Sequence, residues 1–99
     1  MARSAAVTES QLLEQLRREG LQPTRWSNTP GAVYGAHDHP YGKVLVVAAG
    51  QITFTLTSAG RDVAMRPGDR LEIAAGTSHS AVVGPDGVVC LEAHKPVNA

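Results

Sequence analysis

The feature that most constrains this chain is a succession of short strand-like segments separated by glycine and proline turns. The clearest segment is ITFTLT at residues 52–57, where Ile52, Phe54 and Leu56 alternate with three threonines. A period of two is typical of a β-strand with one buried face. Similar runs occupy residues 31–37, 43–49, 61–65, 69–73, 79–83 and 88–94, with turn signals at HPYG, AAGQ, SAGR, RPGD, AAGTS and GPDG. The pattern predicts an all-β, antiparallel sandwich or barrel.

One segment near the N-terminus has helical periodicity instead. Its leucines recur at helical spacing between Thr8 and Glu19. Thr8 and Gln11 have the form of a capping box, and Gly20 supplies a C-terminal stop signal. We therefore expect one short amphipathic α-helix before the strands.

Length and charge limit the domain organisation and the partners. A chain of 99 residues suits one hydrophobic core, so a helix and lead-in segment at 1–30 and a barrel at 31–99 should form one domain. Nine Lys and Arg balance nine Asp and Glu without clustering, which argues against nucleic-acid and membrane partners and favours a small-molecule ligand. The first ten residues lack the pattern of a signal peptide, and one cysteine allows no intramolecular disulfide, so we expect a cytoplasmic protein.

Three histidines form the most informative polar set. His37 and His39 are two residues apart, so on a strand their imidazoles share a face and can point to one position. His79 lies forty residues after His39, at the start of another predicted strand. Three imidazoles from two strands leave coordination positions open and suit Fe, Mn, Ni, Cu or Zn. Hydrogen-bonded surface histidines are the alternative interpretation, because HxH pairs also occur by chance.

The residues around these histidines form two spaced motifs. In the first, intervals of five, one, three and six residues separate Gly31, His37, His39, Lys43 and Gly50. In the second, intervals of five, one and two residues separate Gly68, Ala74, Gly76 and His79. With this spacing the chain, from about Gly31 to Lys95, resembles a small single-domain member of the cupin superfamily.

The resemblance implies a jelly-roll barrel, also called a double-stranded β-helix, with a metal near one end. It places His37, His39 and His79 at the ligand positions and implies a homodimer, which would cover open sheet edges. Cupin barrels serve dioxygenases, isomerases, sugar-processing enzymes and non-catalytic sensors. The expected function is therefore a three-histidine divalent metal centre that acts on or binds a small molecule. The alternative is a non-catalytic ligand-binding or sensor cupin, with or without metal.

The sequence departs from the cupin motifs at three positions. Ala74 replaces a proline and removes mainly turn rigidity, and Val83 stands where some members have asparagine. Lys43 replaces the usual glutamate, and it leaves several interpretations open. In the first interpretation, three histidines hold the metal and Lys43 turns away or pairs with an acid. In the second, Lys43 binds an anionic substrate or moves a proton beside the metal. In the third, the metal is lost. Direct ligation requires a deprotonated amine and is disfavoured by charge repulsion.

Glu92 is a candidate partner for Lys43, and both are candidate catalytic residues. If GPDG forms a tight hairpin that pairs Val83 with Val88, Glu92 falls opposite His79 on the site face. There it can accept from a histidine N–H, pair with Lys43 or act as a displaced carboxylate ligand. A slip of one residue in the register would instead place Glu92 in solvent.

Tyr41, in the HPYG turn, is the third candidate catalytic residue. It can overhang the cavity mouth and donate a hydrogen bond to a ligand, or it can close the barrel end by packing. Asp38 and His94 are expected at the surface. Cys90, among apolar neighbours, is expected to be a buried small hydrophobe rather than a nucleophile. Trp26 is expected to pack the helix against the barrel.

Overall fold

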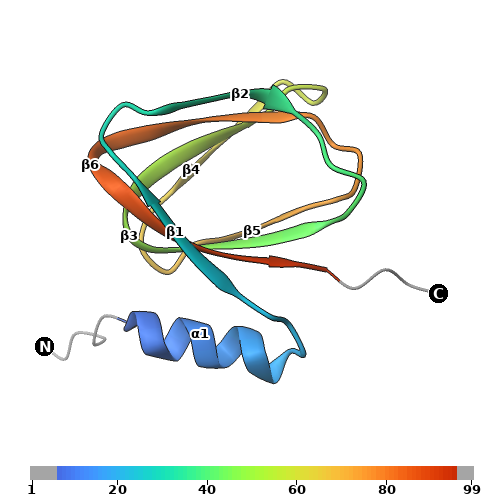
Figure 1. Ribbon diagram of the computed structural model, residues 1–99. Coiled ribbons are helices and arrows are strands. Elements are labelled where there is room, and N and C mark those ends of the chain that lie inside the picture. Colours follow the sequence, from blue (N-terminus) through green and yellow to red (C-terminus); the bar gives the residue numbers. More distant parts are fainter. Residues whose placement is uncertain (1–6, 96–99) are drawn as a thin grey trace, which may run out of the picture.

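The computed structural model describes residues 7–95, and it has the predicted all-β architecture with one N-terminal helix (Figure 1). Two predicted segments lie partly outside the described residues. These are the N-terminal ten residues, which lack a signal-peptide pattern and of which 1–6 are not described, and the barrel segment 31–99, of which 96–99 are not described. The elements in chain order are α1 (Glu9–Arg18), β1 (Thr24–Asn28), β2 (Val33–His37), β3 (Lys43–Leu56), β4 (Arg61–Met65), β5 (Arg70–Ile73) and β6 (His79–His94). Within residues 7–95, no helix has the length and hydrophobicity needed to span a membrane.

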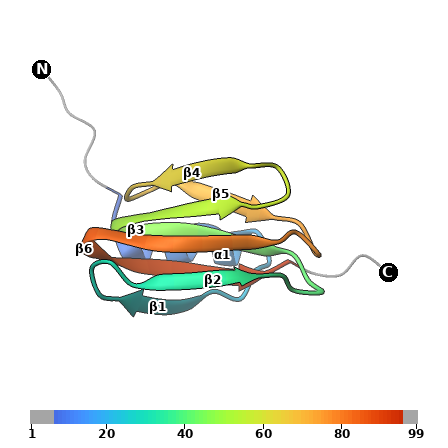
Figure 2. The ribbon, with the colours of Figure 1, turned by 90° about the horizontal axis from the view of Figure 1, so that it is seen from above.

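Two long strands, β3 and β6, form the centre of the barrel. They pair antiparallel along their length, from Lys43 opposite His94 to Leu56 opposite His79. At one end of this pair, β6 also pairs with β1 and β3 also pairs with β5. At the other end, β6 pairs with β2 and β3 pairs with β4. The layer β1–β6–β3–β5 therefore faces the layer β2–β6–β3–β4, and both long strands belong to both layers (Figures 1 and 2). This is the expected jelly-roll arrangement.

The long strands pass from one layer to the other at two glycines. Gly50 has a φ of 74°, and register shifts between β3 and β6 occur on both sides of it. A Cβ atom at Gly50 would lie 2.0 Å from the carbonyl oxygen of Gly87. Only glycine allows both the positive φ and the close approach of the two backbones.

The prediction of reversing turns at AAGQ and GPDG was therefore wrong. Val83 pairs with Ile52 and Val88 pairs with Gly50, so both valines lie opposite β3 and they do not form a hairpin with each other. The physical reason is that a glycine bulge within a strand and a tight turn between two strands favour the same residue types. The sequence signal marks the position of the bend but not its angle.

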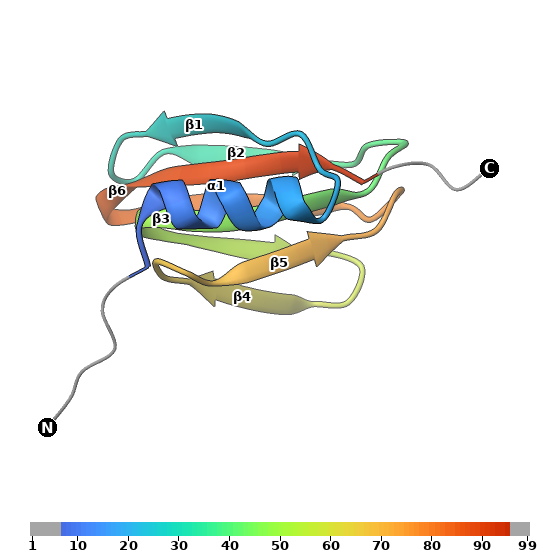
Figure 3. The same cartoon turned by 90° about the horizontal axis from the view of Figure 1, so that it is seen from below.

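Helix α1 lies across the outer face of the β1–β6–β3–β5 layer (Figure 3). It begins at the predicted capping box, where the Thr8 hydroxyl accepts from the Gln11 backbone N–H at 3.1 Å and the Thr8 N–H donates to the Gln11 side chain at 2.9 Å. The cluster beneath the helix consists of Leu16, Leu21, Val44, Val46, Leu91 and Ala93. Because alternate β3 residues face either this cluster or the barrel interior, the run KVLVVAA is apolar on both faces.

Strand β1 was not predicted from the sequence. The run TRWSN has one large apolar residue and no apolar alternation, yet it pairs with β6 and places Trp26 opposite Cys90. Trp26 packs against the cluster inside the barrel, so its expected role between helix and barrel was wrong. Pairing with a long neighbouring strand, rather than local pattern, determines this strand.

An ion-pair network joins the end of α1 to β5 and to the residue after β6. Arg70 donates to both carboxylate oxygens of Glu19 at 2.7 Å and to Glu72 at 3.0 Å, and Lys95 donates to Glu72 at 2.8 Å. The hydrogen bonds from Arg70, followed by one from Gln15, lower the pKa of Glu19 from 4.5 to about 2. The network ties the helix to the layer that it covers.

We predict that the bend tolerates no side chain at Gly50. Gly60→Ala is the matched control, because Gly60 also has a positive φ, of 60°, but its Cβ would meet no atom within 4 Å. The control should lose about 1–2 kcal/mol from the left-handed backbone alone. Gly50→Ala should lose roughly 1–3 kcal/mol more from the clash. Urea unfolding measures the difference, and equal losses would contradict a steric requirement at the bend.

We also predict a contribution of Glu19 to stability that disappears in acid. Because its folded pKa of about 2 lies below the unfolded value of 4.5, the contribution is complete above pH 4.5 and is lost as the pH falls toward 2. Glu19→Gln should therefore reduce the pH dependence of the thermal midpoint in this window. Glu14→Gln is the control, since Glu14 is an exposed helix glutamate paired only with Arg18. An unchanged profile for Glu19→Gln would contradict the assignment.

Candidate metal centre

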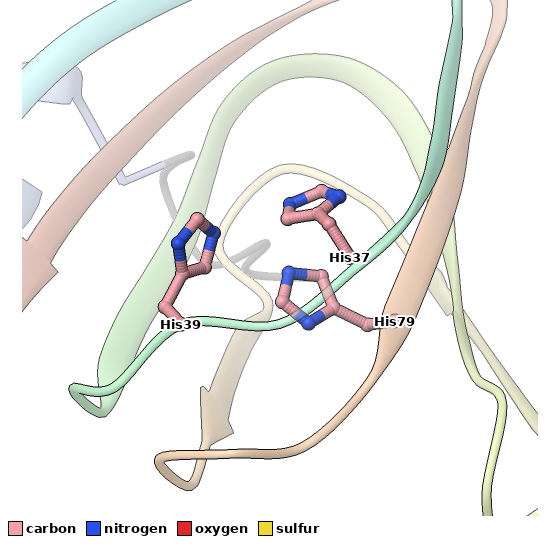
Figure 4. Close-up of side chains that lie close together, drawn as sticks. All are labelled: His37, His39 and His79. Atoms are coloured by element: carbon pink, nitrogen blue, oxygen red, sulfur yellow. The ribbon is translucent and has the colours of Figure 1, made fainter.

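The three histidines converge at one end of the barrel interior (Figure 4). His37 ends β2, His79 begins β6, and these two residues are partners in the register of the neighbouring strands. His39 follows in the loop, where its carbonyl accepts the N–H of Gly76 at 2.8 Å. This hydrogen bond joins the loops of the two sequence motifs. One candidate ligand atom from each histidine lies within 4.8 Å of the others.

The hydrogen bonds of the ring nitrogens fix which atoms face the common point. The Nδ1 of His37 lies 2.7 Å from the Gly35 carbonyl oxygen, and that of His79 lies 2.9 Å from the Thr77 carbonyl oxygen. A carbonyl only accepts, so each Nδ1 carries the hydrogen and each Nε2 keeps a free lone pair. The Nε2 of His39 is buried and has no hydrogen-bond partner among the described residues. Backbone-oriented imidazoles with free nitrogens are the arrangement of metal-binding histidines.

The surroundings of His39 favour its neutral form. Burial lowers the pKa of His39, the Lys43 ammonium lowers it further, and so would a second proton on His37 or His79, whereas the Glu92 carboxylate raises it. A neutral imidazole is the form that binds metal. The electrostatics therefore agree with the hydrogen bonds.

The histidines open into a cavity of about 360 Å³. It is lined by Trp26, Ser27, Tyr34, His37, His39, Lys43, Leu45, Phe54, His79, Ala81 and Glu92. Tyr34 and His37 both reach the cavity because a bulge shifts the register of β2 between them. Strict alternation would have placed them on opposite faces, which is why the sequence did not indicate Tyr34. Trp26 was missed because its strand was not predicted.

Lys43 and Glu92 form an ion pair within this cavity. The Lys43 Nζ lies 3.3 Å from one carboxylate oxygen of Glu92, and the Trp26 indole N–H donates to the other at 3.1 Å. The Lys43 and Glu92 side chains are only 11% and 18% exposed. Glu92 is paired with Leu45 and Thr24 in the sheet, so its expected place opposite His79 was wrong, although it does face the cavity. Among the interpretations of Lys43, pairing with an acid is the one that the geometry matches.

Tyr41 lies between two imidazoles at the barrel end. Its ring stacks on His39 with centroids 5.0 Å apart and on His94 with centroids 3.8 Å apart. Tyr41 is half-buried, while Asp38 and His94 are exposed, as expected. Tyr41 does not line the cavity. Of its two expected roles, its position matches the closing of the barrel end by packing.

Cys90 lies in the interior core and is fully buried. Burial, followed by the charge of Glu92, raises the pKa of the Cys90 thiol to about 12. A thiol that stays protonated at neutral pH is a poor nucleophile. Cys90 therefore has the setting of a small buried hydrophobe, as the sequence indicated.

Comparison with known proteins agrees with the motifs and the fold. Residues 24–93 match the family model of the cupin domain. A search of curated proteins finds no match. One structural neighbour comes from crystal structures of the DMSP lyases RdDddP and RnDddQII, with 26% identity and a TM-score of 0.71 over 78% of this chain and 39% of that chain. This chain thus spans less than half of that neighbour.

Two further neighbours have more similar lengths. KdgF from Halomonas sp. has 25% identity and a TM-score of 0.64, over 79% of this chain and 71% of that chain. An RmlC-like cupin from Shewanella frigidimarina has 22% identity and a TM-score of 0.67, over 79% of this chain and 68% of that chain. With its motifs, its barrel and a family match over most of its length, the chain belongs to the cupin family.

Proposed function

We propose that His37, His39 and His79 hold one divalent transition metal ion, Fe, Mn, Ni, Cu or Zn, and that the adjoining cavity binds a small molecule at this centre. The observation that supports the proposal most directly is the buried, unpartnered Nε2 of His39, beside two histidines whose Nδ1 atoms are already engaged. A buried nitrogen without a partner costs free energy unless it binds something. A metal ion at the common point would satisfy all three nitrogens together.

The charges of the cavity favour an anionic ligand. The three imidazoles are neutral as ligands, and the positive charge of Lys43 is offset by Glu92 at 3.3 Å. When bound, a divalent ion supplies Lewis-acid polarisation and open coordination positions, and no protein carboxylate offsets its charge. Leu45, Phe54 and Ala81 make part of the wall apolar, which excludes water and strengthens the attraction of an anion.

The reaction class that we propose is a metal-dependent oxidation or isomerisation of such a molecule. The match to DMSP lyases supports an enzyme, because a lyase uses this barrel in that protein. The alternative is a non-catalytic binding or sensor cupin, and one observation favours it. Lys43 and Glu92, the lysine and the carboxylate that line the cavity, are engaged in an ion pair with each other.

We further propose that the chain forms a homodimer through the outer face of the β2–β6–β3–β4 layer. Helix α1 covers the other layer, while Val33 and Val82 stay 73% and 50% exposed on this one. The sheet register places Val33, Val82, Thr53 and Ala64 in one uncharged row across four strands. An exposed, uncharged row of this kind suits a second copy of the same face.

The dimer proposal predicts that a charge at Val82 separates the two copies. Val82→Glu should shift sedimentation equilibrium toward the monomer, because a buried unpaired carboxylate in the contact is costly. Val7→Glu is the control, since Val7 is 54% exposed but precedes α1 and lies outside the row. A monomeric parent protein, or a dimer that survives Val82→Glu, would contradict this interface.

The metal proposal predicts that the protein, purified without a chelating tag and reconstituted, carries close to one equivalent of a transition metal. His37→Ala/His39→Ala should lower the affinity by more than the roughly 100-fold that loss of an outer-shell partner costs. His94→Ala is the matched control, because His94 is exposed and outside the three-histidine group. Elemental analysis and competition with a chelator measure the effect. Less than about a tenth of an equivalent in the parent protein would overturn the metal centre.

A further inference from the structure

The cavity contains a carboxylate that is close to the histidine group but directed elsewhere. We propose that Lys43 and Trp26 hold Glu92 away from the metal position, so that Glu92 is a restrained fourth ligand and the centre keeps only three protein ligands. This inference rests on the proposed metal centre. It assigns Lys43 and Trp26 as positioning residues, acting through Glu92, rather than as catalytic residues.

The restraint is visible in the contacts of both carboxylate oxygens. One oxygen accepts from the Trp26 indole N–H at 3.1 Å, and the other faces the Lys43 ammonium at 3.3 Å. Lys43 is the first residue of β3, and its partner Glu92 lies near the end of the neighbouring strand β6. The carboxylate that faces this cavity is therefore paired with a cation from another strand.

Glu92 faces the same cavity as the candidate metal ligands. The cavity of about 360 Å³ is lined by Glu92 together with His37, His39 and His79. Because they share this cavity, we expect another rotamer of the Glu92 side chain to bring its carboxylate toward the histidines without a change in the backbone of β6.

The energetics favour that rotation once Lys43 is removed. The Glu92 side chain is only 18% exposed, and a carboxylate so poorly hydrated needs a compensating charge. Lys43 supplies this charge in the native protein. Without Lys43, the strongest positive charge in the cavity is the metal ion, and an oxygen ligand suits every metal proposed here except copper in its soft, reduced form.

The restraint has a consequence for ligand binding. While Lys43 and Trp26 hold Glu92, the open coordination positions stay available to an external anion, and the metal keeps its full charge. If Glu92 bound the metal, it would occupy one position and cancel part of that charge. Lys43 thus determines whether the metal binds an external anion or the carboxylate of Glu92.

The test uses the full chain with Co²⁺ as the metal probe and azide as the anion probe. Lys43→Met should bind Co²⁺ about tenfold more tightly and azide about tenfold more weakly than the parent protein does. The d–d absorption spectrum of the bound Co²⁺ should also change. Tenfold effects lie within the range of coupling energies between neighbouring residues. Lys43→Met/Glu92→Gln should lose all three changes. Lys95→Met is the matched control, because Lys95 also pairs with a glutamate, Glu72, but on the exposed surface.

The double variant separates ligation by Glu92 from a simple loss of repulsion. If Lys43→Met and the double variant gain the same Co²⁺ affinity with an unaltered spectrum, the effect is only the missing positive charge and the proposal is wrong.

Trp26→Phe is a second test, since it keeps an aromatic ring at this position and keeps Lys43, but it removes the N–H that holds Glu92. It should change the spectrum in the same direction and less strongly, and it remains informative if Lys43→Met fails to fold.

The outcomes also distinguish this inference from the metal proposal. If the parent protein binds Co²⁺ and the spectra of Lys43→Met and Trp26→Phe match the parent spectrum, the metal centre stands and the restraint fails. If the parent and both variants bind no Co²⁺, both proposals fail. If only Lys43→Met binds Co²⁺, the native metal centre is overturned, and the proposal of a restrained ligand fails with it.

Discussion

The antiparallel pairing of β3 and β6 along their full length is the interaction on which the rest of the structure depends. Each strand bends through both layers, so a single pair of strands supplies the middle of the whole barrel. The same pairing carries the polar groups of the cavity: Lys43 stands at one end of β3, while Glu92 and His79 lie near opposite ends of β6. The bend at Gly50 and Gly87 brings these distant positions of β6 to one cavity.

Local sequence signals were sufficient for much of this fold. The capping box at Thr8 and the grouping of the three histidines follow from residue type and spacing. Each of these features is decided within a few residues or by a fixed motif interval. Local signals therefore located the start of the helix and the candidate ligands, but they divided each of the long strands β3 and β6 into two segments.

The features that were missed depend on non-local pairing. Strand β1 has no alternation of its own and is defined by its hydrogen bonds to β6, so Trp26 was assigned to the wrong side of the fold. A bulge between Tyr34 and His37 breaks the period of two, and a glycine bend replaces the hairpin that GPDG suggested. In each case the partner strand selects among conformations that the local sequence permits equally.

Stability alone does not explain the pair of Lys43 and Glu92. Removing two charges from water costs several kcal/mol per ion in a buried setting, and well-packed apolar residues of similar volume are often as stable as a buried ion pair. Apolar side chains at these positions would also extend the wall that Leu45 and Phe54 already form. What apolar residues cannot supply is a carboxylate that faces the same cavity as three histidines and is paired with a cation. If the proposed metal centre is correct, the role of the pair lies in the charge that it sets in the cavity, and through that charge in the kind of ligand that the cavity admits.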